Sequence, residues 1–322
     1  MSRTLYPKIA ENEHFWLPVE NDHQIYVEHS GNVNGIPVVY LHGGPGGGCS
    51  SNHRRYFDPE KYHIILFDQR GSGRSRPSPS IQDNTTAELV KDIELIREHF
   101  GYDKWLVCGG SWGTTLALTY GIQYSDRVTG FILRGVFLGS IAENNWLYES
   151  DGAAHFFPDA YQDFLKPISD SSSSSPLIAY TELLQSANEV AAISASKAWY
   201  LWELRISSLE HTHIGSSYIE DSHQAWCMAL ITTHYLSNNC FLPDRYIIDN
   251  INRISHIPAI ILHGRYDMVC RVSVAHHLAD IWENATLQIL PKAGHGGFES
   301  QTIDAFCKAT DLMAEFLQND IK

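Results

Sequence analysis

Residues 105–124, WLVCGGSWGTTLALTYGIQY, decide the fold class. A short apolar run leads into GGSWG at 109–113, and a helical pattern follows directly. This is the G-x-S-x-G pattern in a strand-turn-helix setting, where small neighbours let a serine occupy a strained turn with its hydroxyl exposed. The pattern predicts Ser111 as a nucleophile, and a glycine-rich turn with an incidental serine is the alternative.

Further apolar runs extend this strand into a sheet. They lie at 38–41, 64–67, 105–108, 131–133, 259–262 and 287–290. Each has the length of a strand buried on both faces, as in a parallel sheet. Between two of them, residues 86–99 have apolar residues at helical spacing, with Thr86 as the expected N-cap. The alternation predicts an α/β fold with a mostly parallel, doubly wound sheet.

The regular succession of short apolar runs ends after about residue 138 and resumes near residue 256. The segment between is rich in Trp, Tyr, Ala and Leu, and Ala198, Trp199, Trp202 and Leu209 follow helical spacing. We therefore expect a helical cap inserted into one core. The predicted division is 1–138 for the first part of the core, 139–253 for the cap and 254–322 for the second part of the core.

Composition limits the partners. The formal net charge of -14 repels phosphate backbones and anionic membrane surfaces, so we expect neither nucleic acid nor a membrane as partner. No apolar stretch reaches the length of a membrane span. The six cysteines are scattered without a C-x-x-C pair, which favours free thiols in a reducing compartment. The sequence thus predicts a cytoplasmic protein without a metal or cofactor.

A serine nucleophile needs a base within hydrogen-bond reach and a third group that orients the base. In this kind of fold the chain order is Ser, acid, His. Asp267 follows the run at 259–262, and His295 lies in a glycine-rich turn just after the last strand. His263 competes as the base, but it ends the strand that already supplies Asp267. We predict a triad of Ser111, Asp267 and His295.

Two glycine-containing loops follow early strands. HGGPGGG at 42–48, together with the backbone N–H of Trp112, is expected to stabilise an oxyanion. A phosphate-binding loop is the rival interpretation, but no Gly-Lys-Ser/Thr follows. DQRGSGRS at 68–75 is expected to be a turn held by its own Asp and Arg side chains, without a catalytic role.

Taken together, these segments resemble the proline iminopeptidase (prolyl aminopeptidase) family, which are serine peptidases of the α/β-hydrolase fold. The matching motifs are HGGPG at 42–46, 68–75, GGSWG at 109–113, GRYD at 264–267 and GH at 294–295. The resemblance runs from LYP at 5–7 to the last helix. It implies a metal-independent aminopeptidase that releases an N-terminal proline from small peptides, with Gly43, Gly44 and Trp112 in the oxyanion region.

The resemblance also names binding residues. AWYLWE at 198–203 is similar to the family's Ala-Trp-x-x-Trp-Glu motif, which makes Glu203 the candidate anchor for the substrate amine. Arg134, Phe137 and Tyr148 fall in stretches similar to the family's proline-pocket segments. A carboxylate in a partly desolvated aromatic site attracts a protonated amine more strongly than it would in water. A solvated glutamate on a helix surface is the alternative.

The segment ALITTHY at 229–235 departs from the family pattern, because Thr232 stands where the family has a glutamate. We therefore expect weaker amine binding, unless Glu143, Glu149 or Glu210 replaces the missing acid. An esterase or amidase for small neutral acyl substrates is the second hypothesis. A non-catalytic binding protein on the same fold is the third.

Overall fold

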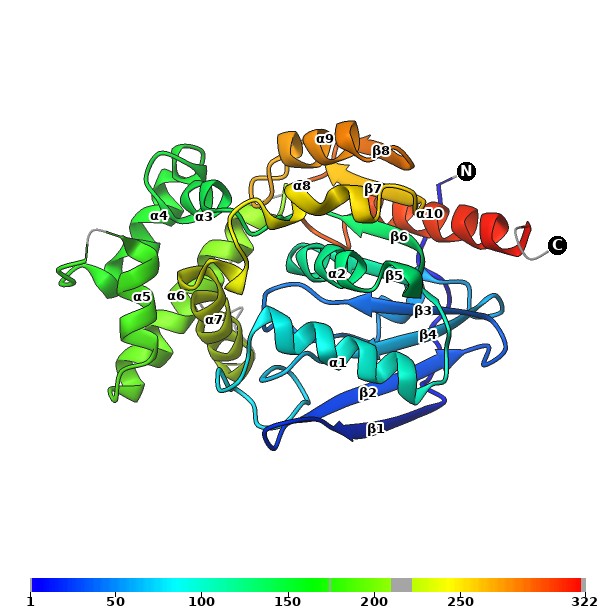
Figure 1. The fold of residues 1–322 in the computed structure, drawn as a ribbon. Helices are drawn as coiled ribbons and strands as arrows, with labels where there is room; N and C mark the ends of the chain where they lie inside the picture. Colours follow the sequence, from blue (N-terminus) through cyan, green and yellow to red (C-terminus); the bar gives the residue numbers. More distant parts are fainter. Residues whose placement is uncertain (1, 174, 210–221, 320–322) are drawn as a thin grey trace.

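A computed structural model describes residues 2–173, 175–209 and 222–319. Its centre is an eight-stranded sheet in the order β1-β2-β4-β3-β5-β6-β7-β8 (Figure 1). The strands are β1 Glu13–Pro18, β2 Gln24–Gly31, β3 Ile36–Leu41, β4 Tyr62–Phe67, β5 Trp105–Gly110, β6 Val128–Arg134, β7 Ala259–Gly264 and β8 Ala285–Leu290. From β4 to β8 the neighbouring strands are parallel, which confirms the predicted mostly parallel α/β sheet.

The six predicted apolar runs all lie within β3 to β8. The antiparallel strands β1 and β2 each have an apolar run of only three residues, with histidine, glutamate or glutamine beside it. The run in β3 shows why a two-sided core forms. Val39 and Leu41 belong to the apolar cluster on one face of the sheet, and Val38 and Tyr40 belong to the cluster on the other.

Helices cover both faces. The cluster that contains Val39 also includes buried residues of α1 Thr86–His99, α2 Trp112–Gln123 and α9 Val272–Ile281. The opposite cluster includes those of α10 Ser300–Asn319. Layers on both faces of a mostly parallel sheet make the core doubly wound, as predicted.

The predicted N-cap of α1 was wrong by one residue. Thr85 is the N-cap, and its side chain accepts a hydrogen bond from the Glu88 N–H at 3.4 Å. Thr86 is fully buried, and its hydroxyl donates to the carbonyl of Cys240 instead. Two adjacent threonines look alike in sequence, and the distant contact of Thr86 decides between them.

Between β6 and β7 the chain forms helices, and all but the last of them extend beyond the sheet (Figure 1). They are α3 Ile141–Tyr148, α4 Pro158–Leu165, α5 Pro176–Leu184, α6 Glu189–Ser207, α7 Ser222–Ser237 and α8 Tyr246–Asn250. The short α8 packs against α2 of the core. Leu209 lies beyond the end of α6, so its place in the helical pattern was wrong. The division at residues 138 and 253 stays a prediction.

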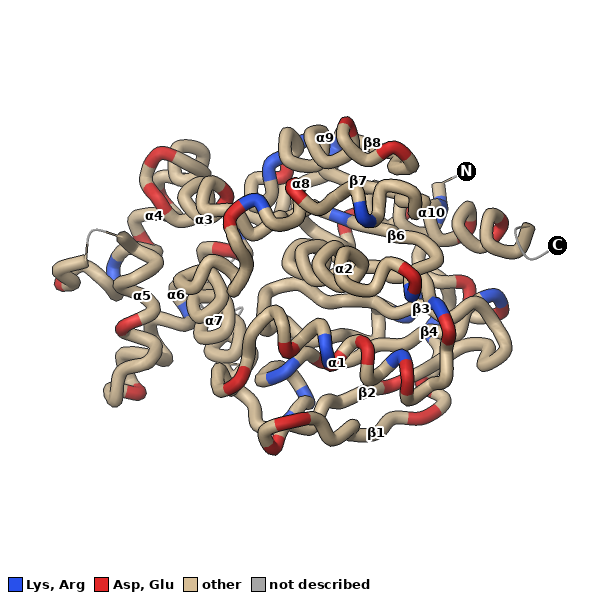
Figure 2. Tube along the Cα trace, viewed as in Figure 1, with Lys and Arg blue, Asp and Glu red and all other residues tan. Residues whose placement is uncertain are grey.

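Charged positions are interspersed over the sheet and the helices beyond it, with acidic ones in excess (Figure 2). All six cysteines are free thiols. Within the described residues, no helix combines the length and apolar character needed to cross a membrane.

Candidate active site

Ser111 occupies the sharp turn between β5 and α2, with φ 56° and ψ −127°. A non-glycine residue rarely adopts positive φ, and such strain concentrates at functional sites. The flanking glycines are required, because a side chain on Gly109 would collide with the Gly113 carbonyl and one on Gly113 with the Leu41 carbonyl. The Ser111 N–H donates to the Arg134 carbonyl at 2.9 Å, which ties the turn to β6.

Asp267 and His295 form a hydrogen-bonded pair. The Nδ1 of His295 lies 2.7 Å from the Oδ2 of Asp267. The other carboxylate oxygen accepts the N–H groups of Val269 at 3.0 Å and Cys270 at 2.7 Å. Burial works to raise the pKa of Asp267, but the imidazole and these hydrogen bonds outweigh it and hold the pKa below its usual value. Asp267 is therefore ionised and fixed in orientation.

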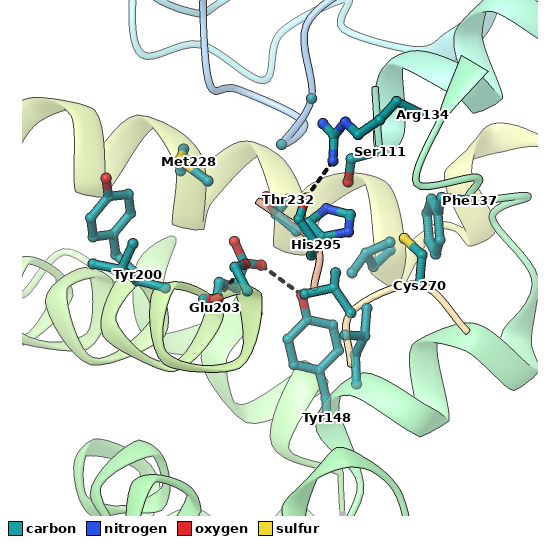
Figure 3. Close-up of a pocket in the computed structure, with 17 residues that line it drawn as sticks. Ser111, Arg134, Phe137, Tyr148, Tyr200, Glu203, Met228, Thr232, Cys270 and His295 are labelled. Carbon is teal, nitrogen blue, oxygen red and sulfur yellow. Dashed lines mark hydrogen bonds between the residues drawn. The ribbon is translucent and has the colours of Figure 1, made fainter. Parts of the chain in front are cut away.

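The backbone of His295 is held from two sides. Its N–H donates to the carbonyl of Ser207 at the end of α6, at 2.9 Å. Its carbonyl accepts from the Nη1 of Arg134 at 2.6 Å (Figure 3). Because Asp267 occupies Nδ1, Nε2 is the ring nitrogen left for Ser111, which lines the same cavity.

His263, the competing candidate for the base, is fully buried. Its Nδ1 accepts the N–H of Val136 at 3.2 Å, and its Nε2–H donates to the carbonyl of Cys270 at 2.8 Å. Burial lowers the pKa of His263, which keeps the ring neutral. With both ring nitrogens engaged, His263 has no free position for a proton from Ser111.

The loop 43–48 lies against the nucleophile. A Cβ on Gly43 would lie 3.1 Å from the Cβ of Ser111, and Gly44 has φ +117°, a region that favours glycine. Trp112 is the first residue of α2, so its N–H has no partner within the helix. Gly43, Gly44 and Ser111 line one cavity, so the loop backbone and the nucleophile border the same space.

Gln69 connects this loop to α2. Its side-chain amide donates to the His42 carbonyl at 2.9 Å and accepts from the Trp112 indole N–H at 2.9 Å. Its backbone N–H donates to the Nε2 of His42 at 3.0 Å. Residues 68–75 were predicted to be a turn without such a role, because the sequence around Gln69 does not indicate its distant partners.

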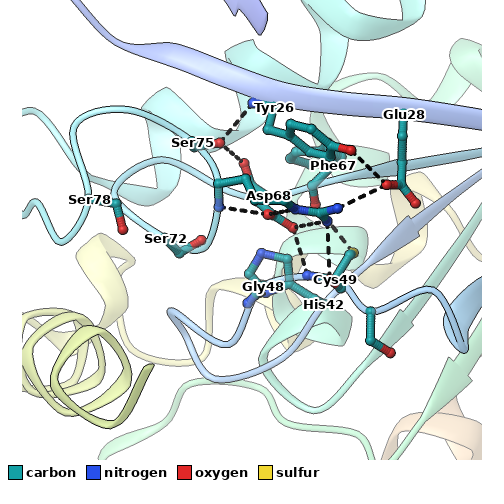
Figure 4. Close-up of polar contacts among 12 residues, drawn as sticks. Tyr26, Glu28, His42, Gly48, Cys49, Phe67, Asp68, Ser72, Ser75 and Ser78 are labelled. Carbon is teal, nitrogen blue, oxygen red and sulfur yellow. Dashed lines mark hydrogen bonds and ion pairs between the residues drawn. The ribbon is translucent and has the colours of Figure 1, made fainter. Parts of the chain in front are cut away.

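The turn at 68–75 is otherwise as expected. The guanidinium of Arg74 donates from Nε to Asp68 at 2.7 Å and pairs with the buried Glu28 at 3.0 Å. The N–H of Cys49 donates to Asp68 at 2.7 Å. These contacts attach the far end of the loop 43–48 to the turn after β4 (Figure 4).

We expect Gln69→Leu to lower kcat by about 10- to 100-fold with KM nearly unchanged, since misplaced oxyanion donors weaken the transition state more than the bound substrate. Steady-state kinetics beside Gln82→Leu, an exposed glutamine replaced in the same way, measures this. A rise in KM alone would contradict a role in placing the oxyanion loop.

A cavity of about 250 Å³ lies between the core and the helices beyond it. Its lining comprises Gly43, Gly44, Ser111, Arg134, Phe137, Leu147, Tyr148, Tyr200, Glu203, Leu204, Ser207, Met228, Thr232, Leu236, Val269, Cys270 and His295 (Figure 3). Among the described residues, Glu203 is the one acid in this lining. The cavity therefore combines the serine, the histidine and one carboxylate.

The carboxylate of Glu203 is held by two aromatic donors. Its Oε1 accepts from the Tyr148 hydroxyl at 2.7 Å and the Trp199 indole N–H at 2.9 Å. Tyr148 stacks on Trp199 with ring centroids 4.4 Å apart. Burial raises the pKa of Glu203 to about 7, although both hydrogen bonds oppose the shift. Oε2 remains for a ligand in the cavity.

Comparison with known proteins identifies the family. Residues 36–302 match the family model of the alpha/beta hydrolase fold. The chain is 44% identical to the proline iminopeptidase of Xanthomonas citri, over 97% of this chain and 100% of that protein. It is 43% identical to the proline iminopeptidase of Arabidopsis thaliana, over 92% of this chain and 78% of that one. The chain belongs to the proline iminopeptidase family.

Solved structures agree on the fold. An alpha/beta fold family hydrolase from Bacillus anthracis has a TM-score of 0.62 at 18% identity, with 94% of this chain and 100% of that chain covered. A proline iminopeptidase-related protein from Thermus thermophilus has a TM-score of 0.54 at 22% identity, with 96% and 98% covered. At these identities the likeness shows the fold alone.

The predicted pocket residues of this family member all line the cavity, with different partners. Tyr148 contacts Glu203, and the ring of Phe137 forms part of the wall (Figure 3). Arg134 contacts the backbone of His295. Arg134 thus supports the histidine loop, a contact that no local sequence pattern indicates.

The three acids considered as replacements for the family glutamate do not occupy equivalent positions. Glu143 accepts hydrogen bonds from Leu138 and Ser140 as part of a helix cap, and Glu149 accepts from the Ser175 hydroxyl at 3.1 Å. Neither lines the cavity. Glu210 lies outside the described residues. Within the described residues, no group of three or more His, Cys, Asp or Glu is placed to hold a metal ion.

Proposed function

We propose that this chain is a serine aminopeptidase that releases an N-terminal proline from small peptides. The observation that carries the proposal is the shared cavity, in which Glu203 lies together with Ser111 and His295. A small cavity with one anionic group suits a single residue with a protonated amine. The names of the relatives support proline as that residue.

The reaction begins with proton transfer. His295 takes the proton of Ser111 at Nε2, and the serine oxygen attacks the carbonyl carbon of the first residue. The resulting oxyanion accepts hydrogen bonds from the backbone N–H groups of Gly44 and Trp112. Asp267 stabilises the charged imidazole through the 2.7 Å contact at Nδ1.

Collapse of the intermediate breaks the peptide bond. His295 gives its proton to the leaving amine, and the proline remains as an ester on Ser111. Water then attacks this ester, with His295 again as the base. The free amino acid leaves, and the serine hydroxyl is restored.

Glu203 supplies recognition of the amine. Its Oε2 pairs with the protonated imino group, while Oε1 stays on Tyr148 and Trp199. Such a pair is stronger in a partly desolvated cavity than in water. Phe137 and Tyr148 give the proline ring apolar walls.

Hydrolysis of small neutral acyl substrates is the second candidate function. Thr232 favours it, because this residue brings a neutral hydroxyl to the cavity lining in place of a second carboxylate. The same serine and histidine would act on an ester that has no cationic end.

The two functions are separated with purified protein and three reporters: L-prolyl 4-nitroanilide, L-alanyl 4-nitroanilide and 4-nitrophenyl acetate. The proposal predicts the highest kcat/KM for the prolyl compound. A preference for the ester, with the prolyl compound ignored, would make the chain an esterase of this fold.

The pH dependence of kcat/KM should show the ionisation of Glu203. Its pKa of about 7 means that the ionised fraction falls as the pH falls through 7. The ratio of kcat/KM for the prolyl reporter to that for the ester should therefore drop about tenfold from about pH 7.5 to 6, because any titration shared by both substrates cancels. In Glu203→Gln this ratio should be flat. A drop that persists in the variant would assign the titration to another group.

We place the enzyme in the cytoplasm, and its six free thiols support a reducing compartment. Its net charge of -14 supports a partner other than nucleic acid.

A further inference from the structure

The loop 43–48 is glycine-rich, and the core holds its two ends. Gly44, Gly46 and Gly48 have positive φ angles, so the loop has little conformational preference of its own. The Gly47 N–H donates to the Gly43 carbonyl at 3.2 Å, and the Nδ1–H of His42 donates to the same carbonyl at 2.9 Å. The middle of the loop needs another support.

Helix α7 supplies that support. The Oγ1 of Thr232 donates to the Pro45 carbonyl at 3.0 Å. A Cβ on Gly46 would lie 2.9 Å from the Cys227 carbonyl and 3.2 Å from the Cα of Met228, so the helix backbone packs directly on the loop. Thr232 is buried and also lines the cavity (Figure 3).

We infer that Thr232 is a positioning residue for the oxyanion loop. By holding the Pro45 carbonyl, its hydroxyl fixes the neighbouring residue Gly44, whose N–H points to the developing oxyanion in the mechanism above. The inference rests on the proposed function for the role of Gly44. It makes α7 a structural part of the catalytic apparatus, in addition to a wall of the cavity.

Oxyanion donors act through preorganisation, so a loop that moves by a fraction of an ångström loses transition-state binding while the ground state is little changed. The rival role for Thr232 is an acceptor for the substrate amine, because its oxygen retains lone pairs when its proton is on Pro45. The rival role affects binding of the cationic substrate only. Loss of the positioning role would therefore lower kcat for both kinds of substrate, and loss of the amine-acceptor role would raise KM for the cationic substrate.

Thr232→Val keeps the shape of the side chain and removes the donor. It should lower kcat about tenfold for both L-prolyl 4-nitroanilide and 4-nitrophenyl acetate, with KM within about twofold of wild type. Thr232→Ser, which keeps the hydroxyl, should restore most of kcat. Thr233→Val is the matched control, because Thr233 is a buried neighbour on α7 that does not line the cavity and donates within its own helix.

A higher KM for the prolyl reporter alone, with kcat unchanged, would overturn the inference in favour of the amine acceptor. Wild-type kinetics on both substrates in Thr232→Val would overturn it as well. If Thr232→Val fails to fold, Thr232→Ala removes the same donor. A wild-type enzyme that cleaves only the ester would refute the prolyl function, and the kcat loss on the ester would still test Thr232.

Discussion

Ser111→Ala should lower kcat for L-prolyl 4-nitroanilide by about 10⁵-fold or more, because removal of the nucleophile disables the triad as a unit. Residual turnover would come from binding and from the oxyanion donors alone. The variant should unfold at nearly the wild-type temperature, since it loses one hydroxyl group and the backbone conformation of the turn at residue 111 is unchanged. Stopped assays run over hours can detect the very low kcat of the variant, and active-site titration of the wild type gives the enzyme concentration for the comparison.

A fluorophosphonate probe provides the control for this result. It should label wild type at Ser111 and leave Ser111→Ala unlabelled, while Ser78→Ala, a serine outside the cavity lining, should label like wild type. Undiminished prolyl cleavage by Ser111→Ala would contradict the mechanism.

Glu203→Gln should lower kcat/KM for the prolyl reporter by about 100-fold, equivalent to about 2.7 kcal/mol. The amide keeps the shape of the side chain and loses the charge that pairs with the substrate amine, and truncation of such pairs in desolvated sites has effects of this size. The value for 4-nitrophenyl acetate should stay within about threefold, because the ester has no cation. Parallel kinetics on the two substrates measure the difference.

Glu149→Gln is the matched control, since Glu149 contacts Ser175 away from the cavity and should leave both substrates unaffected. Equal losses on both substrates in Glu203→Gln would indicate that the glutamate supports the fold of the site and does not recognise the amine.

Local sequence patterns were sufficient to predict most of the fold. Fully buried strands such as β4 and β5 contain continuous apolar runs, and the strained turn at Ser111 requires glycines that are visible in the sequence. Strands β1 and β2 were missed, because an apolar run of three residues between polar residues does not stand out from a loop. The N-cap of α1 was misplaced, because the burial of Thr86 depends on a residue 154 positions away.

In the site, too, local sequence patterns indicated some residues, and contacts between distant segments could not be predicted. Ser111, Asp267 and His295 were predicted from turn context and chain order. The structure brings Asp267 and His295 into contact and places Ser111 and His295 in the lining of one cavity. The supports of the site were not found. The contacts of Gln69 with Trp112 and of Thr232 with Pro45 join segments far apart in the chain, and neither residue type signals such a partner.

Recognition of a protonated N-terminal amine is the central claim, and a pair of matched substrates tests it most directly. We would measure kcat/KM of wild type on L-prolyl 4-nitroanilide and on N-acetyl-L-prolyl 4-nitroanilide, which differ in the charge and the acyl group at the imino nitrogen. The account predicts a preference of about 100-fold or more for the free imino compound, since Glu203 pairs only with the cation. Equal cleavage of the two compounds would contradict it.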